Sequence, residues 1–315
     1  MTERAAPFIT VVLCTHNREL YLAMAIDSIL AQHAKGVPYE LLVVDNCSTD
    51  GTSVLCERYA GRLEFRYIQE SQLGLCHARN AGWRNARGVI VAYFDDDAIA
   101  DPGWVKAIAE AFIQYPNAGV AGGQVRPIWE RTRPRWLSDG IAYSLTIVDW
   151  SSQPKLIPDP RVEWLVGANM AIPARILDEV GGFETRLDRS GTSMLSGGDV
   201  FLQHRIVDLG YECVYFPEMS IRHLVPVNRL TKSWFTHRYY WQGISDAVMA
   251  LIRCGPMTWK ERVGAAGREA LGLLSQPKQM AEVALSTDDP VQFERKCMAL
   301  IRIGFIAGML GKAKA

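Results

Sequence analysis

The feature that most constrains the fold is an alternation of short β-branched runs with helical stretches between about residues 8 and 125. The runs FITVVLC, YELLVVD, LEFRYIQ and VIVAYF have the length and composition of buried strands. Segments such as LYLAMAIDSILAQ and GWVKAIAEAFIQ have the length and apolar content of helices. This alternation predicts βαβ units, and therefore an α/β fold with a mostly parallel, Rossmann-like sheet flanked by helices.

Polar side chains follow three of the predicted strands at the points where the strands end. In open parallel sheets, ligands bind outside the carboxyl ends of the strands, so these positions are candidates for a binding site. They are Thr15, His16 and Asn17 after the first strand; Asp45, Asn46, Ser48 and Asp50 after the second; and Asp95, Asp96 and Asp97 after the fourth.

The FDDDA segment predicts a divalent cation. Two carboxylates about 4 Å apart repel by about 4 kcal/mol at an effective dielectric of about 20, so a cluster of three favours a bound cation. Mg²⁺ or Mn²⁺ binds one or two carboxylates and keeps its other positions for water and phosphate oxygens. The alternative is a polar turn, but Asp101 and Pro102 are expected to supply the cap and first turn of the following helix.

Composition excludes several classes of protein. Lys plus Arg and Asp plus Glu both number 34, so no overall basic field would attract nucleic acid. No GxxxxGK[ST] or GxGxxG sequence occurs, which leaves a cation rather than a glycine-rich loop to neutralise a diphosphate. The seven cysteines are scattered without a CxxC pair, and no apolar run is long enough to span a bilayer. These features predict reduced thiols and a cytoplasmic location.

The second half of the chain is less regular. Residues 126–165 are rich in Trp and Pro and predict a long excursion that carries substrate contacts. Beyond about Leu230 the pattern is only helical, and the segment ALIRIGFIAGMLGKAKA mixes apolar and basic residues. This tail predicts either a helix packed on the domain or a partner, or an interfacial helix that rests on the inner face of a membrane.

Four segments in order, VVLCTHNR, LLVVDNCSTDGT, GLCHARNAGW and VAYFDDDAIADPGW, resemble family 2 glycosyltransferases with the GT-A fold. The downstream GGDV and the histidine of SIRH extend the resemblance, which covers roughly residues 8–245. It implies a glycosyltransferase domain over residues 1–228, followed by a helical extension over residues 229–315. It also implies transfer of a sugar from a nucleotide diphosphate donor, in particular a UDP-sugar, to an acceptor hydroxyl in polysaccharide or glycolipid synthesis.

The resemblance assigns donor-binding roles to matched positions. By this resemblance the nucleotide sugar is bound by Cys14, Thr15, His16, Asp45, Arg79, Asp95 and Asp96. Cys14 replaces the family's usual proline and His16 its usual tyrosine, which puts base stacking at that point in doubt. Asp97 is implied as the main ligand of a Mn²⁺ or Mg²⁺ ion, with Asp95 and His223 completing the metal site.

The resemblance also implies a catalytic base and an acceptor side. In GGDVFLQHRI, Asp199 matches the aspartate that serves as general base, and Gly198 stands where the family commonly has glutamate. A single displacement with inversion at the anomeric carbon would follow. Arg229 and Arg238 match positions near the diphosphate or acceptor. We expect Trp136, Asn169 and Gly198 on the side of a saccharide or lipid-linked acceptor.

Three other functions compete with sugar transfer. A catalytically inactive sugar-binding or scaffold member of the same fold is favoured by Gly198. A glycoside hydrolase would use paired carboxylates but has no need of a diphosphate-binding cation. A sugar nucleotidyltransferase would require a glycine-rich entry sequence, which this chain lacks.

Overall fold

The computed structural model describes residues 9–34, 36–188, 193–284 and 286–312. The chain divides into two compact units, each made of segments that are separate in the sequence. The first contains Met1–Ile128, Thr146–Thr185 and Gly198–Leu224; the second contains Trp129–Leu145, Arg186–Gly197 and Val225–Ala315. The second unit thus joins the C-terminal helices to two earlier segments. The domain boundary predicted after residue 228 stays a prediction.

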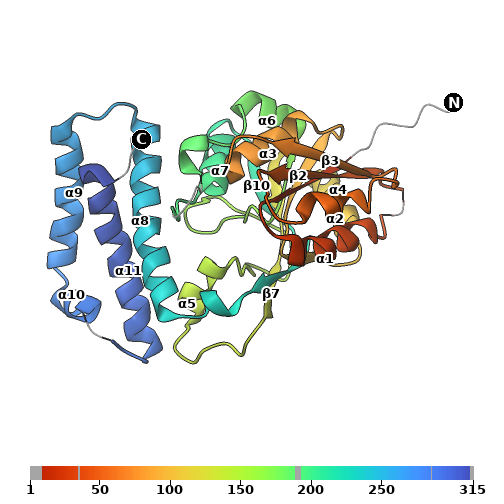
Figure 1. The fold of residues 1–315 in the computed structure, drawn as a ribbon. Coiled ribbons are helices and arrows are strands. Elements are labelled where there is room, and N and C mark those ends of the chain that lie inside the picture. Colours follow the sequence, from red (N-terminus) through yellow and green to blue (C-terminus); the bar gives the residue numbers. More distant parts are fainter. Residues whose placement is uncertain (1–8, 35, 189–192, 285, 313–315) are drawn as a thin grey trace. The chain divides into compact units, whose positions relative to one another are not determined.

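The first unit is built on an eight-stranded sheet with the order β3-β2-β1-β4-β9-β6-β10-β8 (Figure 1). Strands β1, β2, β3 and β4 are parallel to one another, as are β6 and β10, whereas β9 is antiparallel to β4 and β6. Their bounds are β1 (Ile9–Thr15), β2 (Tyr39–Asn46), β3 (Phe65–Glu70), β4 (Ile90–Asp95), β6 (Ala118–Gly122), β8 (Lys155–Leu156), β9 (Asn169–Pro173) and β10 (Glu212–Tyr215). The predicted mostly parallel α/β sheet is confirmed.

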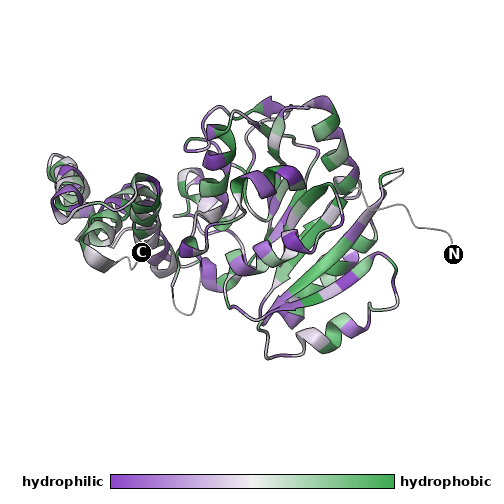
Figure 2. Cartoon of the chain, turned by 90° about the horizontal axis from the view of Figure 1, so that it is seen from above, coloured by the Kyte–Doolittle hydropathy of each residue, from purple (hydrophilic) through white to green (hydrophobic). Residues whose placement is uncertain are grey.

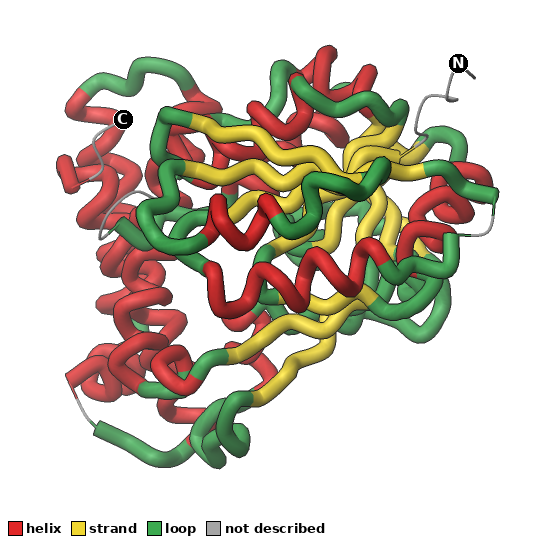
Figure 3. Tube along the Cα trace, turned by 45° about the vertical axis from the view of Figure 1, so that its right-hand side comes forward, coloured by secondary structure: helices red, strands yellow, loops and turns green. Residues whose placement is uncertain are grey.

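Helices pack against the strands of this sheet (Figure 3). They are α1 (Glu19–Leu30), α2 (Thr52–Glu57), α3 (Leu75–Arg84), α4 (Trp104–Gln114), α6 (Ala174–Val180) and α7 (Gly198–Asp208). All residues of β1 are buried, and the central strands are coloured hydrophobic over much of their length in Figure 2. Because both faces of a parallel strand are covered, its sequence is a continuous apolar run rather than an alternating one.

A smaller sheet lies beside the end of β4. It has the order β5-β11-β7, with β5 (Ala98–Ala100), β11 (Ile221–Val225) and β7 (Val125–Trp129). Strand β5 follows the three aspartates directly and runs antiparallel to β11, with Ala98 opposite His223. A segment near residue 220 is thereby held against the acidic end of β4.

The expected cap of α4 is wrong in detail. Gly103, in the left-handed conformation with φ of 95°, occupies the N-cap position, and no side chain caps the helix. The carboxylate of Asp101 instead forms ion pairs with Arg126 and Arg222 of the smaller sheet. Glycine adopts a positive φ without the steric cost that a Cβ imposes, which explains the shift of the cap by two positions.

The second unit is mainly helical. It contains α5 (Asp139–Ala142), α8 (Lys232–Cys254), α9 (Trp259–Leu274), α10 (Pro277–Ala284) and α11 (Pro290–Ala307). Thr231 caps α8, and Thr258 with Glu261 forms a capping box at the start of α9. No helix among the described residues is long and apolar enough to cross a bilayer.

The apolar tail singled out in the sequence packs along α8. Helices α8 and α11 approach so closely that a Cβ on Gly243 would clash with the carbonyl of Ile301, and one on Gly304 with the carbonyl of Tyr240. Phe293 and Cys297 of α11 are also buried. This segment therefore packs its hydrophobic surface within the second unit, which agrees with the expectation of a packed helix rather than an interfacial one.

Candidate active site

Three strand ends of the larger sheet meet at one edge because their registers align. Thr15 at the end of β1 lies opposite Asp45 of β2, and Cys14 lies opposite Asp95 of β4. Parallel strands in register place their carboxyl ends side by side. This alignment brings together the polar residues that the sequence placed at the ends of the strands.

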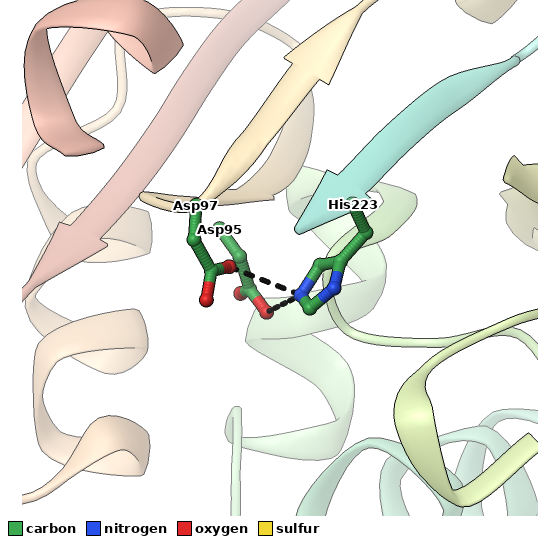
Figure 4. A group of neighbouring side chains, drawn as sticks. All are labelled: Asp95, Asp97 and His223. Atoms are coloured by element: carbon green, nitrogen blue, oxygen red, sulfur yellow. Dashed lines mark ion pairs between the residues drawn. The ribbon is translucent and has the colours of Figure 1, made fainter. Parts of the chain in front are cut away.

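Asp95, Asp97 and His223 form the densest group of potential cation ligands among the described residues (Figure 4). One ligand atom from each lies within 4.8 Å of the others. His223 Nε2 is 3.0 Å from Asp97 Oδ1 and 3.9 Å from Asp95 Oδ2. Two carboxylates and an imidazole are a donor set that suits Mn²⁺, and the imidazole is compatible with Zn²⁺ as well.

The pairing of β5 with β11 explains how His223 reaches the aspartates. The amide of Leu224 donates to the carbonyl of Asp97 at 2.9 Å, next to the Ala98–His223 pair. His223 is 2% exposed, and its Nδ1 has no hydrogen-bond partner in the described part of the chain. Its Nε2 is therefore the ring nitrogen that faces the carboxylates, as Figure 4 shows.

Asp96 lies outside this group of three. It is buried, and burial raises its pKa to about 7, with the charge of Asp97 adding to the effect. Arg18 moderates the repulsion, since its Nη2 is 3.6 Å from Asp97 Oδ2. Asp96 and Asp97 lie in the turn between β4 and β5, and of the three aspartates only Asp95 and Asp97 are grouped with His223.

Arg79 of α3 lies between two of the predicted site carboxylates. It is 6% exposed; its Nη2 is 3.4 Å from Asp95 Oδ1, and its guanidinium carbon lies 5.3 Å from the centre of the Phe183 ring. Burial acts to lower the pKa of Arg79, but the charges of Asp95 and Asp199 outweigh it and raise that pKa. Arg79 therefore stays cationic and links the acidic end of β4 electrostatically to the start of α7.

Asp199, in the first turn of α7, is held by backbone amides. Its Oδ2 accepts from the amide of Gly167 at 2.9 Å, and its Oδ1 accepts from the amide of Val200 at 2.9 Å. A Cβ on Gly167 would lie 2.5 Å from Arg79 Nη2, so a larger residue there would displace the guanidinium. Asp199, Gly167, Arg79 and Asp95 thus form one continuous row within the first unit.

Gln203, one turn after Asp199, fixes the same loop from inside the protein. Its Oε1 accepts from the amide of Leu165 at 2.9 Å, and its Nε2 donates to the carbonyl of Leu165 at 2.7 Å and to that of Asp199 at 3.1 Å. Gln203 is fully buried. We call Asp199, Gln203 and residues 165–167 the α7 clamp, because two side chains of α7 hold this loop.

The predicted nucleotide positions at the ends of β1 and β2 are tied together by hydrogen bonds. Asp45 Oδ2 accepts from the Tyr67 hydroxyl at 2.6 Å, and Oδ1 accepts from the amide of Ser48 at 3.0 Å. Burial and this carboxylate raise the pKa of Tyr67, which keeps it protonated as a donor. His16 Nδ1 lies 2.6 Å from the carbonyl of Asn46. The donor-binding roles of His16 and Asp45 stay predictions.

The predicted acceptor residues lie in different surroundings. Asn169 is fully buried: its amide donates to the carbonyls of Gln124 and Met219, and its Oδ1 accepts from Trp104 Nε1 at 2.8 Å. This side chain has no exposed surface and all its polar atoms are hydrogen-bonded within the protein, and its acceptor-binding role stays a prediction. Asn169 is a structural residue that fastens β9 to its neighbours.

Trp136 and Gly198 stay predictions for the acceptor side. Trp136 is half-buried in the second unit, with its ring centre 5.3 Å from that of Phe235 and 5.0 Å from that of Phe293. Gly198 is buried in the first unit, and a Cβ there would lie 3.0 Å from the Cys76 sulfur. Cys76 thus occupies space next to the position where the family commonly has glutamate.

Sequence reasoning missed three residues that shape this region, namely Arg18, Phe183 and Gln203. Arg18 follows the polar end of β1, so its place beside an acidic strand end could have been inferred. Gln203 is four residues after Asp199, which puts both on one face of α7. Nothing in the local sequence around Phe183 indicates that it lies against Arg79.

Comparison with known proteins shows the family of the chain. The sequence profile of Glycosyl transferase family 2 matches residues 10–180. The chain belongs to glycosyl transferase family 2. It is 27% identical over 252 residues to a glucosyl-dolichyl phosphate glucuronosyltransferase of Haloferax volcanii, with 78% of each chain covered.

Two solved glycosyltransferase structures resemble the fold. A mannosyltransferase from Pyrobaculum calidifontis, in complex with GDP-Man and Mn²⁺, superposes with a TM-score of 0.62 and 21% identity, covering 98% of this chain and 88% of that one. TarS of S. aureus, in complex with UDP-GlcNAc, gives a TM-score of 0.56 and 17% identity, covering 77% of this chain and 66% of that one. The structural likeness shows the GT-A fold, and membership of the family makes the chain a glycosyltransferase.

Proposed function

We propose that this family 2 enzyme is an inverting, divalent-cation-dependent glycosyltransferase that moves a sugar from a UDP-sugar to an acceptor hydroxyl. The observation that carries the proposal is the row from Asp199 through Gly167 and Arg79 to Asp95, which puts a candidate base and a candidate cation site on one side of the first unit. A glycoside hydrolase would not require the acidic group at the end of β4.

The residues of this row divide the work of a single displacement. Asp199 takes the proton of the acceptor hydroxyl as its oxygen attacks the anomeric carbon, and the bond from that carbon to the diphosphate oxygen breaks. Its two hydrogen bonds from backbone amides use two of about four acceptor sites on a carboxylate, which leaves capacity for the hydroxyl. Attack opposite the leaving group inverts the configuration.

The negative charge of the departing diphosphate would be countered by a metal cation and by two arginine side chains. Asp97, Asp95 and His223 would hold a Mn²⁺ or Mg²⁺ ion, which supplies positive charge to the diphosphate oxygens when bound. Arg79 and Arg18 add fixed positive charge next to Asp95 and Asp97. Thr15, Cys14, His16, Asp45 and Asp96 complete the proposed donor side.

We further propose that the acceptor is a saccharide or a lipid-linked saccharide and that the protein works on the cytoplasmic side. The named activity of the Haloferax volcanii relative, which acts on glucosyl-dolichyl phosphate, supports a lipid-linked acceptor. The neutral balance of charged residues supports a donor and acceptor other than nucleic acid.

A thermal-shift screen of nucleoside diphosphates with and without Mn²⁺ tests the donor and cation together. A ligand present at 100 times its Kd stabilises the folded protein by about 2.7 kcal/mol. We expect UDP with Mn²⁺ to raise the melting temperature more than either alone. Stabilisation by GDP but not UDP would overturn the choice of base, and no shift with any diphosphate and Mn²⁺ would overturn the donor site.

The second candidate is a sugar-binding member of the family without transferase activity. It is favoured by Gly198, since no glutamate precedes Asp199 and Cys76 takes up the adjoining space. Slow hydrolysis of a UDP-sugar by the purified protein would exclude this candidate. Tight binding of UDP with Mn²⁺ but no hydrolysis and no transfer would support it.

A further inference from the structure

The second unit has an exposed helix face that is apolar and basic. On α9, Trp259, Val263, Leu271 and Leu274 are between 42% and 69% exposed. They recur at intervals of four, eight and three residues, so they gather on one broad side of the helix. The opposite side packs inward, with Ala265, Ala266 and Leu273 buried. An exposed apolar stripe of this length is uncommon on a surface that meets only water.

The same face carries cations. Lys260 and Arg268 are exposed, and neither pairs with an acidic side chain among the residues that the structure describes. Glu269 lies 3.8 Å from Arg302, whereas Glu261, which closes the capping box with Thr258, is exposed and keeps its charge. With Lys260 and Arg268 against Glu261, the exposed residues of α9 carry an excess of one positive charge.

We propose that this α9 face (Trp259, Lys260, Val263, Arg268, Leu271 and Leu274) rests on a membrane surface that carries anionic lipids. A helix lying in the interface inserts its apolar side chains between headgroups while flanking Lys and Arg meet lipid phosphates. The stripe from Trp259 to Leu274 is about 22 Å long at 1.5 Å per residue, enough for several headgroups. Trp at one end matches the preference of indole rings for the interface.

Charge complementarity favours lipid over a second copy of the chain. A second copy would bring the same excess of positive charge to this face, whereas an anionic lipid surface carries the opposite charge. The end of α11, for which the sequence also predicted membrane contact as one alternative, packs against α8 and therefore leaves less apolar surface for a membrane. The proposal concerns binding alone and does not depend on the donor sugar or on transfer activity.

Co-sedimentation with vesicles tests the proposal on the full chain. We expect strong binding to phosphatidylcholine mixed with phosphatidylglycerol, and weak binding to phosphatidylcholine alone. Changing Lys260→Gln and Arg268→Gln together should weaken binding to the anionic vesicles roughly thirty-fold, since each cation contributes roughly five-fold. Changing Leu271→Glu and Leu274→Glu together should reduce binding to background.

A matched control separates this face from a general loss of hydrophobic surface. Ile113, at the end of α4 in the first unit, is 74% exposed, and Ile113→Glu should leave vesicle binding unchanged. Circular dichroism should show that all variants keep the helical content of the parent. Equal binding to both kinds of vesicle, or loss of binding by the control, would overturn the proposal. Self-association in sedimentation velocity that the Leu271 and Leu274 changes abolish would assign the face to a second copy instead.

Discussion

The two carboxylate regions of the candidate site are built in opposite ways. At the end of β4, Asp95 and Asp97 lie close to each other and to His223, with Arg79 and Arg18 beside them, and Asp95 keeps about a third of its side-chain surface exposed. At the start of α7, both oxygens of Asp199 already accept backbone amides. The first arrangement stores repulsion that a bound cation would relieve; the second fixes one carboxylate in place. The difference indicates two roles: the end of β4 is suited to binding a cation, and the start of α7 holds one carboxylate in a fixed position.

Asp199→Asn should remove the function of the carboxylate at the start of α7 and leave binding of nucleotide and cation intact. Asparagine keeps the shape and one acceptor oxygen but cannot take a proton, so kcat should fall by about 10² to 10⁴-fold. The shift with UDP and Mn²⁺ should persist. Asp178→Asn, which changes an exposed carboxylate on α6, is the control and should leave both measurements unchanged. Equal loss of nucleotide binding in Asp199→Asn would show that the two regions are not separate.

Asp97→Asn should instead remove cation binding at the end of β4. Removing one of two closely spaced carboxylates takes away a cation ligand, so the Mn²⁺-dependent part of the thermal shift, about 2.7 kcal/mol at 100 times Kd, should disappear. Transfer should fall with it. Titration with Mn²⁺ in the presence of UDP measures the effect directly. A Mn²⁺ response equal to that of the parent would remove this aspartate from the proposed ligand set.

Gln203→Leu tests the α7 clamp itself. Leucine has a similar size but leaves the amide and carbonyl of Leu165 without their partners, which should cost about 1 to 3 kcal/mol of folding free energy. The same loop carries the Gly167 amide that holds Asp199, so we also expect kcat to fall. The Mn²⁺-dependent thermal shift should change little. Gln114→Leu, on an exposed part of α4, is the matched control. A stability loss without any change in kcat would show that the clamp is purely structural.

Asp96→Asn, measured without metal, tests the buried carboxylate beside the candidate cation site. Burial raises the pKa of Asp96 to about 7, above its value in the unfolded chain, so the folded state holds this proton longer. The parent protein should therefore lose about 1.4 kcal/mol of stability per pH unit as the pH rises towards 7 and then level off. The asparagine variant lacks this loss. Urea unfolding at several pH values in EDTA gives the comparison, and parallel curves for the two proteins would contradict it.

The predictable parts of the molecule are those set by local pattern. The strand runs, the polar strand ends and the three aspartates follow from short-range periodicity, and the registers of β1, β2 and β4 then bring them together. The helix cap at Gly103 and the full burial of Asn169 were not predictable in this way. Both depend on partners distant in sequence, Arg126 and Arg222 for Asp101, and Trp104 and Met219 for Asn169.

The short pairing of β5 with β11 has a consequence for how the protein acquires function. Asp97 and His223 are far apart in the sequence, and the antiparallel pairing of β5 with β11 brings them together. A partly folded chain that lacks β11 would hold the aspartates but not the imidazole. Cation affinity should therefore report on completion of folding, and a truncation before residue 221 should yield a protein that retains its sheet but cannot assemble the three-residue ligand group.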